Sequence, residues 1–105
     1  MNIHRNAFSG RNFEYYSEDG YLSGCVAVAE IAAVRKLGII PYMKHFVLND
    51  SETDRARGIC TWSTEQAIRE IYLKPFEMAI KEADANGIMN SKNSIGSRWI
   101  GSNAD

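Results

Sequence analysis

The chain of 105 residues alternates between short apolar runs and longer segments with apolar residues at helical spacing. A strand is expected to end around Ile3, and a long polar and aromatic loop follows it to Gly20. Residues 22–37 are dense in Ala and Val, and Gly38 supplies the left-handed cap that ends a helix. Apolar residues lie on both sides of this helix: one side carries Leu22, Val26, Ala29, Ala33 and Leu37, and the other Val28, Ile31 and Val34. We therefore expect the helix to be covered on more than one side.

A second predicted strand lies in the middle of the chain. Residues 39–47 form a short apolar run with charge only near its end, which is typical of a buried parallel strand that begins at Pro41. The polar residues 48–61 predict a loop. Ser63 is the expected N-cap of the next helix, and Gln66 completes a capping box with it.

Pro75 divides the second helical region, because proline lacks the amide hydrogen that a helix interior requires. Beyond it, the predicted inner stripe consists of Phe76, Ala79, Ile80 and Ala83. Asn86-Gly87 is expected to end this helix, and Ile88-Met89 to begin a third strand.

The predicted order of elements is strand, helix, strand, helix, strand. Such alternation is typical of an α/β architecture with parallel strands joined by right-handed crossover helices. No repeat or linker divides the sequence, so residues 1–105 are expected to form a single unit. Three parallel strands leave two edges unpaired, and such edges pair readily with a neighbour. We therefore expect the chain to be a piece of something larger, either a homo-oligomer or a fragment that complements another.

Composition narrows the classes of function. Apolar residues make up 45% of the chain and charged residues 24%, as in a soluble globular domain. The formal net charge of −1 gives no general attraction to nucleic acid or to an anionic membrane. No apolar run approaches the roughly 20 residues of a membrane-spanning helix, and the first residues lack the apolar stretch of a signal peptide. We expect a cytoplasmic protein without nucleic-acid or membrane partners.

The sequence offers no motif for a cofactor or a metal. Cys25 and Cys60 lack the spacing of a zinc or redox site. A disulfide between them and a pair of free thiols both remain open, and the usual behaviour of cysteines in a reducing compartment favours the thiols. The loop carboxylates Asp50, Glu52 and Asp54 lack the regular pattern of a calcium loop, so solvated charges and local ion pairs are expected there. Glycine-rich nucleotide motifs are also absent.

Reactive groups of parallel α/β folds gather at the carboxyl ends of the strands. Three groups of polar residues follow the predicted strands: His4, Arg5 and Arg11; Lys44 and His45; and Asn90, Ser91, Lys92 and Asn93. Lys44 and His45 are the most informative, because adjacent side chains point to opposite sides of a strand unless the strand bends or ends there. The structural alternative for Lys44 is a salt bridge with Asp50 or Glu52. For His45 it is a hydrogen-bonded packing role.

Several longer blocks of the sequence match one family pattern in series. They are Asn2-Ile3-His4-Arg5 with residues 10–19; Lys44-His45-Phe46 with Asn49, Glu52 and Arg55; residues 64–77; and Met89, Ser91, Asn93, Ile95 and Gly96. In this order they resemble glycoside hydrolase family 3, in its β-glucosidase-type branch. The resemblance covers nearly the whole chain. The stretch after His45 lacks the loop rich in Gly and His of the N-acetylhexosaminidase branch.

The resemblance implies a partial TIM barrel, a (β/α)8 fold of which about three parallel strands with crossover helices lie in this chain. Enzymes of this type release terminal β-linked sugars with retention of configuration, using an aspartate nucleophile and a glutamate acid/base. The resemblance places both carboxylates outside residues 1–105, so we expect no catalytic residue here and no activity of the isolated chain. It assigns Arg11, Lys44 and His45 to substrate binding in the −1 subsite, where they hold sugar hydroxyls.

Two positions depart from the family pattern. Gly20 stands where the family usually has a proline, and Lys92 stands where it typically has a tyrosine close to the active site. The second departure changes the expected substrate geometry.

Two classes of function follow from the sequence. The first is part of a hydrolase whose substrate is a β-glucoside or an oligosaccharide, and the alternative is a non-catalytic, self-associating barrel fragment with a structural or interaction role.

Overall fold

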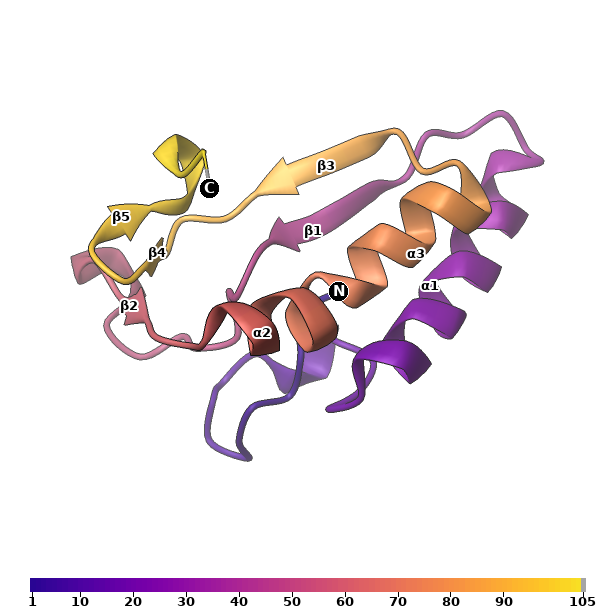
Figure 1. Ribbon diagram of the computed structural model, residues 1–105. Helices are drawn as coiled ribbons and strands as arrows, with labels where there is room; N and C mark the ends of the chain where they lie inside the picture. Colours follow the sequence, from indigo (N-terminus) through magenta and orange to yellow (C-terminus); the bar gives the residue numbers. More distant parts are fainter. Residues whose placement is uncertain (105) are drawn as a thin grey trace.

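Two helices cover one face of a two-stranded parallel sheet (Figure 1). The structure, a computed structural model, describes residues 1–104. The helices α1 and α3 pack against each other. A second sheet, made of the very short strands β2, β4 and β5, lies at the end of the molecule away from α1. The bounds are α1 Gly20–Arg35, β1 Tyr42–Phe46, β2 Cys60–Thr61, α2 Glu65–Ala67, α3 Lys74–Ala83, β3 Gly87–Asn90, β4 Ser94–Ile95 and β5 Arg98–Trp99.

The central sheet confirms the parallel arrangement expected from the sequence. Strands β1 and β3 pair in parallel, with Tyr42 opposite Gly87 and Met43 opposite Ile88, and the register shifts before Phe46. The peptide bonds Lys44–His45 and Phe46–Val47 are cis. Strands β2 and β4 form a second parallel pair, and β5 joins β4 in antiparallel orientation. The chain is therefore an α/β fold with parallel strands.

The strand expected around Ile3 is not formed, so the parallel sheet of β1 and β3 has two strands within the described residues instead of three. The N-terminal segment nevertheless lies beside β1. The Asn2 side-chain amide donates to the carbonyl of His45 at 2.9 Å, and its oxygen accepts from the backbone amide of Asn49 at 3.0 Å. These bonds run through a side chain, so they hold the segment in place without building a backbone ladder.

Helix α1 begins two residues earlier than predicted. The carboxylate of Asp19 accepts a hydrogen bond from the backbone amide of Leu22 at 2.8 Å, which makes Asp19 the N-cap. At the other end Gly38 has a φ of +76°, as its predicted role after the helix requires. The residue that determines the start of the helix is Asp19, the N-cap, which precedes the apolar run.

Within residues 1–104, α1 is covered on one side only, and the expected cover on a second side is not supplied by this chain. Its buried residues are Gly20, Ser23, Gly24, Ala27 and Ile31, whereas Leu22 and Val26 are exposed. The buried face is made largely of small residues because α3 approaches closely there. A Cβ atom at Gly24 would lie 2.4 Å from the sulfur of Met78. The interface between the two helices therefore depends on small side chains on α1.

The second helical region confirms the break at Pro75 and corrects both of its predicted ends. The N-cap is Thr64 and not Ser63, because the Thr64 hydroxyl accepts from the backbone amide of Ala67 at 3.2 Å. The short helix α2 continues into a π-helical turn over Ile68–Tyr72, and α3 then starts with Pro75 in its first turn. Helix α3 ends before Asn86-Gly87, because Asp84 adopts the left-handed conformation with a φ of +52°.

The core lies between the sheet and the two helices. Phe76 of α3 is 1% exposed and meets Phe46 of β1 edge to face, with 5.1 Å between the ring centroids. Of the predicted stripe on α3, Ala79 and Ala83 are buried with Phe76, whereas Ile80 is 45% exposed. Within residues 1–104, no helix combines the length and the apolar character needed to cross a membrane.

Candidate functional site

The predicted site residues gather at the carboxyl end of β1. Lys44 and His45 lie in the strand itself, and Arg11 lies directly before a short 3₁₀ turn, Asn12–Glu14. Glu14 of this turn connects two of them: one carboxylate oxygen accepts from the Arg11 guanidinium at 2.5 Å, and the other accepts from the Lys44 ammonium at 2.9 Å. The structure thus places Arg11 and Lys44 on one shared carboxylate.

Glu14 holds its charge in a half-enclosed position. Its side chain is 12% exposed, and that of Arg11 is 10% exposed. Burial by itself raises the pKa of the Glu14 carboxyl, but the hydrogen bonds from Lys44 and Arg11 and their positive charges outweigh it, so the pKa is lowered. Glu14 is therefore ionised at neutral pH and orients both cations.

Arg11 has a second carboxylate partner in the polar loop after β1. The Glu52 carboxylate lies 3.0 Å from one terminal nitrogen of Arg11 and 3.6 Å from one of Arg55. A continuous row of alternating charges thus runs from Lys44 through Glu14, Arg11 and Glu52 to Arg55. Neighbouring charges in such a row fix one another's side-chain positions.

His45 is 4% exposed and packs against Tyr15. Its Nδ1 lies 3.2 Å from the Tyr15 hydroxyl. That hydroxyl donates to the carbonyl of Asn49 at 2.6 Å, so its single hydrogen is already used. Nδ1 of His45 must then carry the proton of the neutral ring and donate to Tyr15. The other ring nitrogen, Nε2, is left as an acceptor, and no hydrogen bond within residues 1–104 involves it.

The environment keeps His45 neutral. Burial lowers its pKa to about 4, and the positive charges of Arg11 and Lys44 act in the same direction. A neutral imidazole with an unprotonated Nε2 can accept a hydrogen bond from a hydroxyl group. The site therefore combines cationic donors and one neutral acceptor at the end of β1.

The structural alternatives at the end of β1 have different outcomes. Lys44 forms a salt bridge, but its partner is Glu14 and not Asp50 or Glu52, so the alternative named the wrong partner. Asp50 is instead buried, and burial raises the pKa of its carboxyl. His45 does have the hydrogen-bonded packing partner that the alternative required, Tyr15.

The residues after the other two predicted strands reach the site only in part. His4 contacts the carbonyls of Asn12 and Tyr15 through Nε2, whereas Arg5 turns away to the carbonyl of Trp62 and the ring of Tyr72. Beyond β3, Ser91 and Asn93 are buried, and the Asn93 amide donates to the carbonyl of Val47 at 3.2 Å. They support the backbone of β1. Lys92 is exposed.

The thiols and carboxylates form no metal site in the described part of the chain. Cys25 and Cys60 are both free and exposed. No group of three or more His, Cys, Asp or Glu side chains within residues 1–104 is arranged to hold a metal ion. The charged loop after β1 forms ion pairs instead, between Glu52 and Arg55 and between Asp54 and Arg57.

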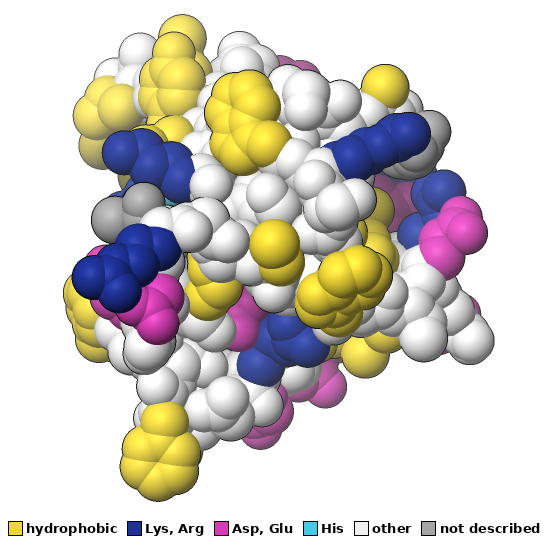
Figure 2. All heavy atoms as spheres, turned by 90° about the vertical axis from the view of Figure 1, so that its left-hand side faces the viewer, with side chains coloured by type: hydrophobic (Ala, Val, Ile, Leu, Met, Phe, Trp, Pro, Cys, Tyr) yellow, Lys and Arg dark blue, Asp and Glu magenta, His cyan; other side chains and the backbone are white. Residues whose placement is uncertain are grey.

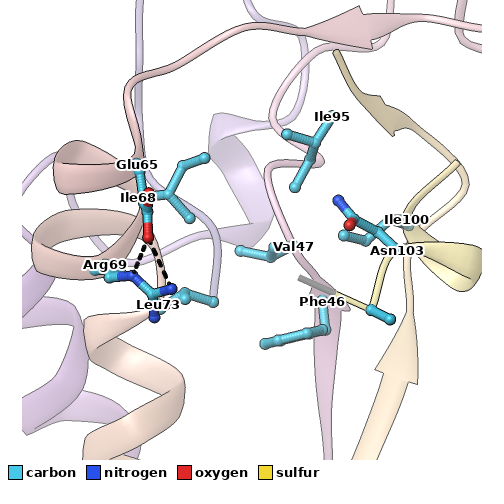
Figure 3. A pocket seen from close by; sticks show the side chains of 10 residues that line it. Phe46, Val47, Glu65, Ile68, Arg69, Leu73, Ile95, Ile100 and Asn103 are labelled. Atoms are coloured by element: carbon cyan, nitrogen blue, oxygen red, sulfur yellow. Dashed lines mark hydrogen bonds and ion pairs between the residues drawn. The ribbon is translucent and has the colours of Figure 1, made fainter. Parts of the chain in front are cut away.

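A separate apolar pocket lies between β1 and the π-helical turn (Figure 3). Its volume is about 530 Å³, and Glu65 and Arg69 form an ion pair at 2.9 Å on one side of it. The residues that line it are Phe46, Val47, Glu65, Ile68, Arg69, Leu73, Ile95, Ile100, Asn103 and Ala104. None of the three predicted site residues lines it, so this pocket belongs to a different surface.

Comparison with known proteins decides the family. The sequence model of one protein family, the glycosyl hydrolase family 3 N terminal domain, matches residues 1–102 of this chain. The chain belongs to glycosyl hydrolase family 3. This match confirms the family that the blocks of the sequence resemble.

Curated relatives of this family 3 chain include β-glucosidases. It is 41% identical over 105 residues to a β-glucosidase of Ruminococcus albus, and it covers 100% of its own length but 11% of that protein. It is 50% identical over 82 residues to β-glucosidase A of Butyrivibrio fibrisolvens, covering 78% of the chain and 10% of the relative. The chain thus spans about a tenth of the length of these curated relatives.

Solved β-glucosidases share this fold. A structure of β-glucosidase 3B from Thermotoga neapolitana in complex with α-D-glucose matches with a TM-score of 0.92 at 44% identity, covering 98% of this chain and 14% of that one. A β-glucosidase from Paenibacillus barengoltzii matches with a TM-score of 0.92 at 48% identity, covering 98% and 11%. The arrangement of α1, α3, β1 and β3 is therefore that of the corresponding segment of family 3 enzymes.

Sequence reasoning missed the residues that connect the site. Glu14, Tyr15, Asn49 and Asn2 all bond to site residues or to the backbone that carries them. One local signal was available: Glu14 follows Arg11 by three residues, a spacing that lets an acid and a base pair within one turn. The bond between Tyr15 and His45 joins residues 30 positions apart, and no local pattern indicates it.

Proposed function

We propose that this chain is the part of a β-glucosidase-type hydrolase that holds the terminal sugar of a β-glucoside in the −1 subsite, for cleavage with retention of configuration. Arg11, Lys44 and His45 are the proposed sugar-binding residues. The nucleophile and the acid/base are proposed to lie in other segments, because the family resemblance assigns both outside residues 1–105. On this proposal the 105-residue chain does not hydrolyse glycosides by itself.

The observation that carries the proposal is the shared carboxylate of Glu14. It fixes Arg11 and Lys44 side by side, at the strand that also carries His45. A sugar presents neighbouring hydroxyls, each of which both donates and accepts hydrogen bonds. Two fixed donors beside one acceptor match such a pattern, and buried groups made for hydroxyls reject ligands that lack them.

The fold is proposed to be an arc of a (β/α)8 barrel. Two features support this: β1 and β3 pair in parallel, and the crossover between them includes α3, which covers one face of the sheet. In such barrels the binding groups lie at the carboxyl ends of the strands, where Lys44 and His45 are found.

A chimera tests the proposed function. Residues 1–104 replace the matching segment of β-glucosidase 3B from Thermotoga neapolitana, and kcat/KM is measured with an aryl β-glucoside. We expect the chimera to hydrolyse the substrate, and Lys44→Ala to lower kcat/KM by about a hundredfold, because the transition state loses a charged donor. Lys81→Ala is the matched control, since Lys81 is paired with Glu77 on the exposed side of α3. A Lys44→Ala chimera within twofold of its parent would contradict the proposal.

A second candidate function is self-association of a non-catalytic fragment. Large hydrophobic side chains are exposed on the described surface, among them Trp62 at 72% and Tyr42 at 69%. Figure 2 shows several such hydrophobic side chains standing out on the face that carries β2, β4 and β5. Sedimentation equilibrium of the chain tests this candidate: association at micromolar concentration supports it, and a folded monomer contradicts it.

A further inference from the structure

A second hollow lies beside the proposed sugar site and is lined only by charged residues. Its volume is about 450 Å³, and the lining residues are Glu52, Asp54, Arg55, Arg57 and Lys92. Glu52 is shared with the proposed sugar site, because its carboxylate also contacts Arg11 at 3.0 Å. Glu52 therefore connects the hollow directly to Arg11, one of the residues proposed to hold the sugar.

The cations of this hollow are incompletely neutralised. Three basic side chains face two carboxylates. The Glu52 carboxylate lies closer to Arg11, at 3.0 Å, than to Arg55, at 3.6 Å. Asp54 is 4.0 Å from Arg57. Lys92 has no ion pair within residues 1–104. The hollow thus carries an excess of positive charge.

One donor of a residue that lines the hollow also lacks an acceptor. The Nε atom of Arg55 is buried and has no hydrogen-bond partner within the described residues. A buried N–H group without an acceptor costs free energy, so the guanidinium of Arg55 has an incomplete set of hydrogen bonds. A neutral hydroxyl can accept a bond from the exposed part of the Arg55 guanidinium, but only an anion also compensates the unpaired charge of Lys92.

We propose that this hollow binds the anionic group, a carboxylate or a phosphate, of an acidic glycoside. This proposal rests on the proposed sugar-binding function, because it places the sugar ring against Arg11, Lys44 and His45 and its anionic substituent against Arg55 and Lys92. Arg55 supplies a donor in a rigid guanidinium plane, and Lys92 supplies a mobile point charge. Lys92 is then the residue that sets the preference for an acidic over a neutral sugar.

NMR titration of the 105-residue chain tests this assignment. The probes are glucose, glucuronate, glucose 6-phosphate and inorganic phosphate, and the signals followed are the Arg55 side-chain N–H and the backbone amides of residues 11, 45 and 92. We expect each acidic sugar to bind about fivefold more tightly than glucose and to shift the Arg55 and Lys92 signals, as one partly exposed ion pair allows. Inorganic phosphate should bind more weakly than glucose 6-phosphate, because it lacks the sugar contacts.

Two charge-neutralising variants separate the site from general charge effects. Lys92→Gln should reduce the affinity for glucuronate and glucose 6-phosphate to that for glucose. Lys36→Gln is the matched control, because Lys36 is exposed beyond the end of α1 and outside the hollow, and it should leave all affinities unchanged. Equal effects of the two variants would overturn the proposal.

The remaining outcomes distinguish this proposal from the proposed function. Equal affinity for glucose and the acidic sugars, with shifts at residues 11 and 45, overturns the acidic-group site and leaves the sugar site standing. Phosphate that binds as tightly as glucose 6-phosphate, without shifts at residues 11 and 45 for any sugar, overturns both. Absence of any shift in the Arg55 and Lys92 signals with the acidic sugars also overturns the assignment.

Discussion

Replacing Glu14 by glutamine tests whether one partly buried carboxylate organises the site. The substitution keeps the shape of the side chain and removes its charge. The amide can still accept a hydrogen bond through its oxygen, but its nitrogen now faces either Arg11 or Lys44 as a second donor. One of the two cations therefore loses its acceptor.

The expected loss follows from the exposure of the three side chains. The contact between Arg11 and Glu14 joins side chains that are 10% and 12% exposed, and a charge-assisted hydrogen bond of this kind contributes about 1.5–3 kcal/mol. Lys44 is 50% exposed, so its pair adds under about 1 kcal/mol. Glu52 still compensates part of the charge of Arg11. We expect Glu14→Gln to lower the free energy of unfolding by about 2 kcal/mol.

Urea denaturation at pH 7, followed by circular dichroism, measures this loss. Glu77→Gln is the matched control, because Glu77 also bridges two cations, Lys74 and Lys81, but on an exposed face of α3. Its denaturation midpoint should stay close to that of the parent chain. Equal midpoints for the two variants would refute the reasoning, since burial is the property in which the two carboxylates differ.

The effect of Glu14→Gln should also depend on pH. The pKa of Glu14 in the folded chain is lowered from the ordinary value of 4.5 by its hydrogen bonds to Lys44 and Arg11, although burial opposes them. A lowered carboxyl pKa contributes stability above pH 4.5, and this contribution is lost as the pH falls through the folded-state pKa. The difference between the parent chain and the variant should therefore narrow below pH 4.5. A difference that is constant from pH 7 to pH 3 would contradict the assignment of the loss to this charge.

Three further predictions concern the contact of α1 with the π-helical turn, the core and the imidazole. Gly20→Ala should lower the free energy of unfolding by about 1–3 kcal/mol in urea, because its Cβ would lie 2.5 Å from the backbone oxygen of Ile71, and an unchanged midpoint would count against it. Phe76→Ala should cost about 3–5 kcal/mol in the same assay, whereas Phe8→Ala, at 92% exposure, should have no effect. With its pKa lowered to about 4 by burial, His45 should show NMR ring signals that stay constant between pH 6 and 8; a midpoint near 6.5 would disprove this.

The sequence predicted those parts of the fold that follow from local periodicity and from proline or glycine. Strand β1, the break at Pro75 and strand β3 are of this kind. The buried face of α1 could not be found in this way, because Gly24 and Ala27 contribute little hydrophobicity and are buried through their small size. The π-helical turn before α3 follows from tertiary packing, for which a single sequence gives no periodic signal.

The position of the candidate site could be predicted from the sequence, but the hydrogen bonds and ion pairs that join its residues could not. Lys44 and His45 were expected where a parallel strand ends, and they lie there. The loop that carries Arg11 and Glu14 has only one short 3₁₀ turn among its described elements, so no periodic pattern indicates which residues its side chains contact. The link from Glu14 to Lys44 spans 30 positions and depends on how that loop folds back onto β1.

Two neighbouring residues of the N-terminal loop determine the chemistry of the site. Glu14 holds the two cations, and Tyr15 holds His45 in the tautomer that leaves Nε2 as an acceptor. Because the two are adjacent in the chain, any shift of this turn moves the donors and the acceptor together. A perturbation that loosens the turn should therefore weaken all the proposed sugar contacts at once, whereas a change at Lys92 should alter only the proposed preference between acidic and neutral sugars.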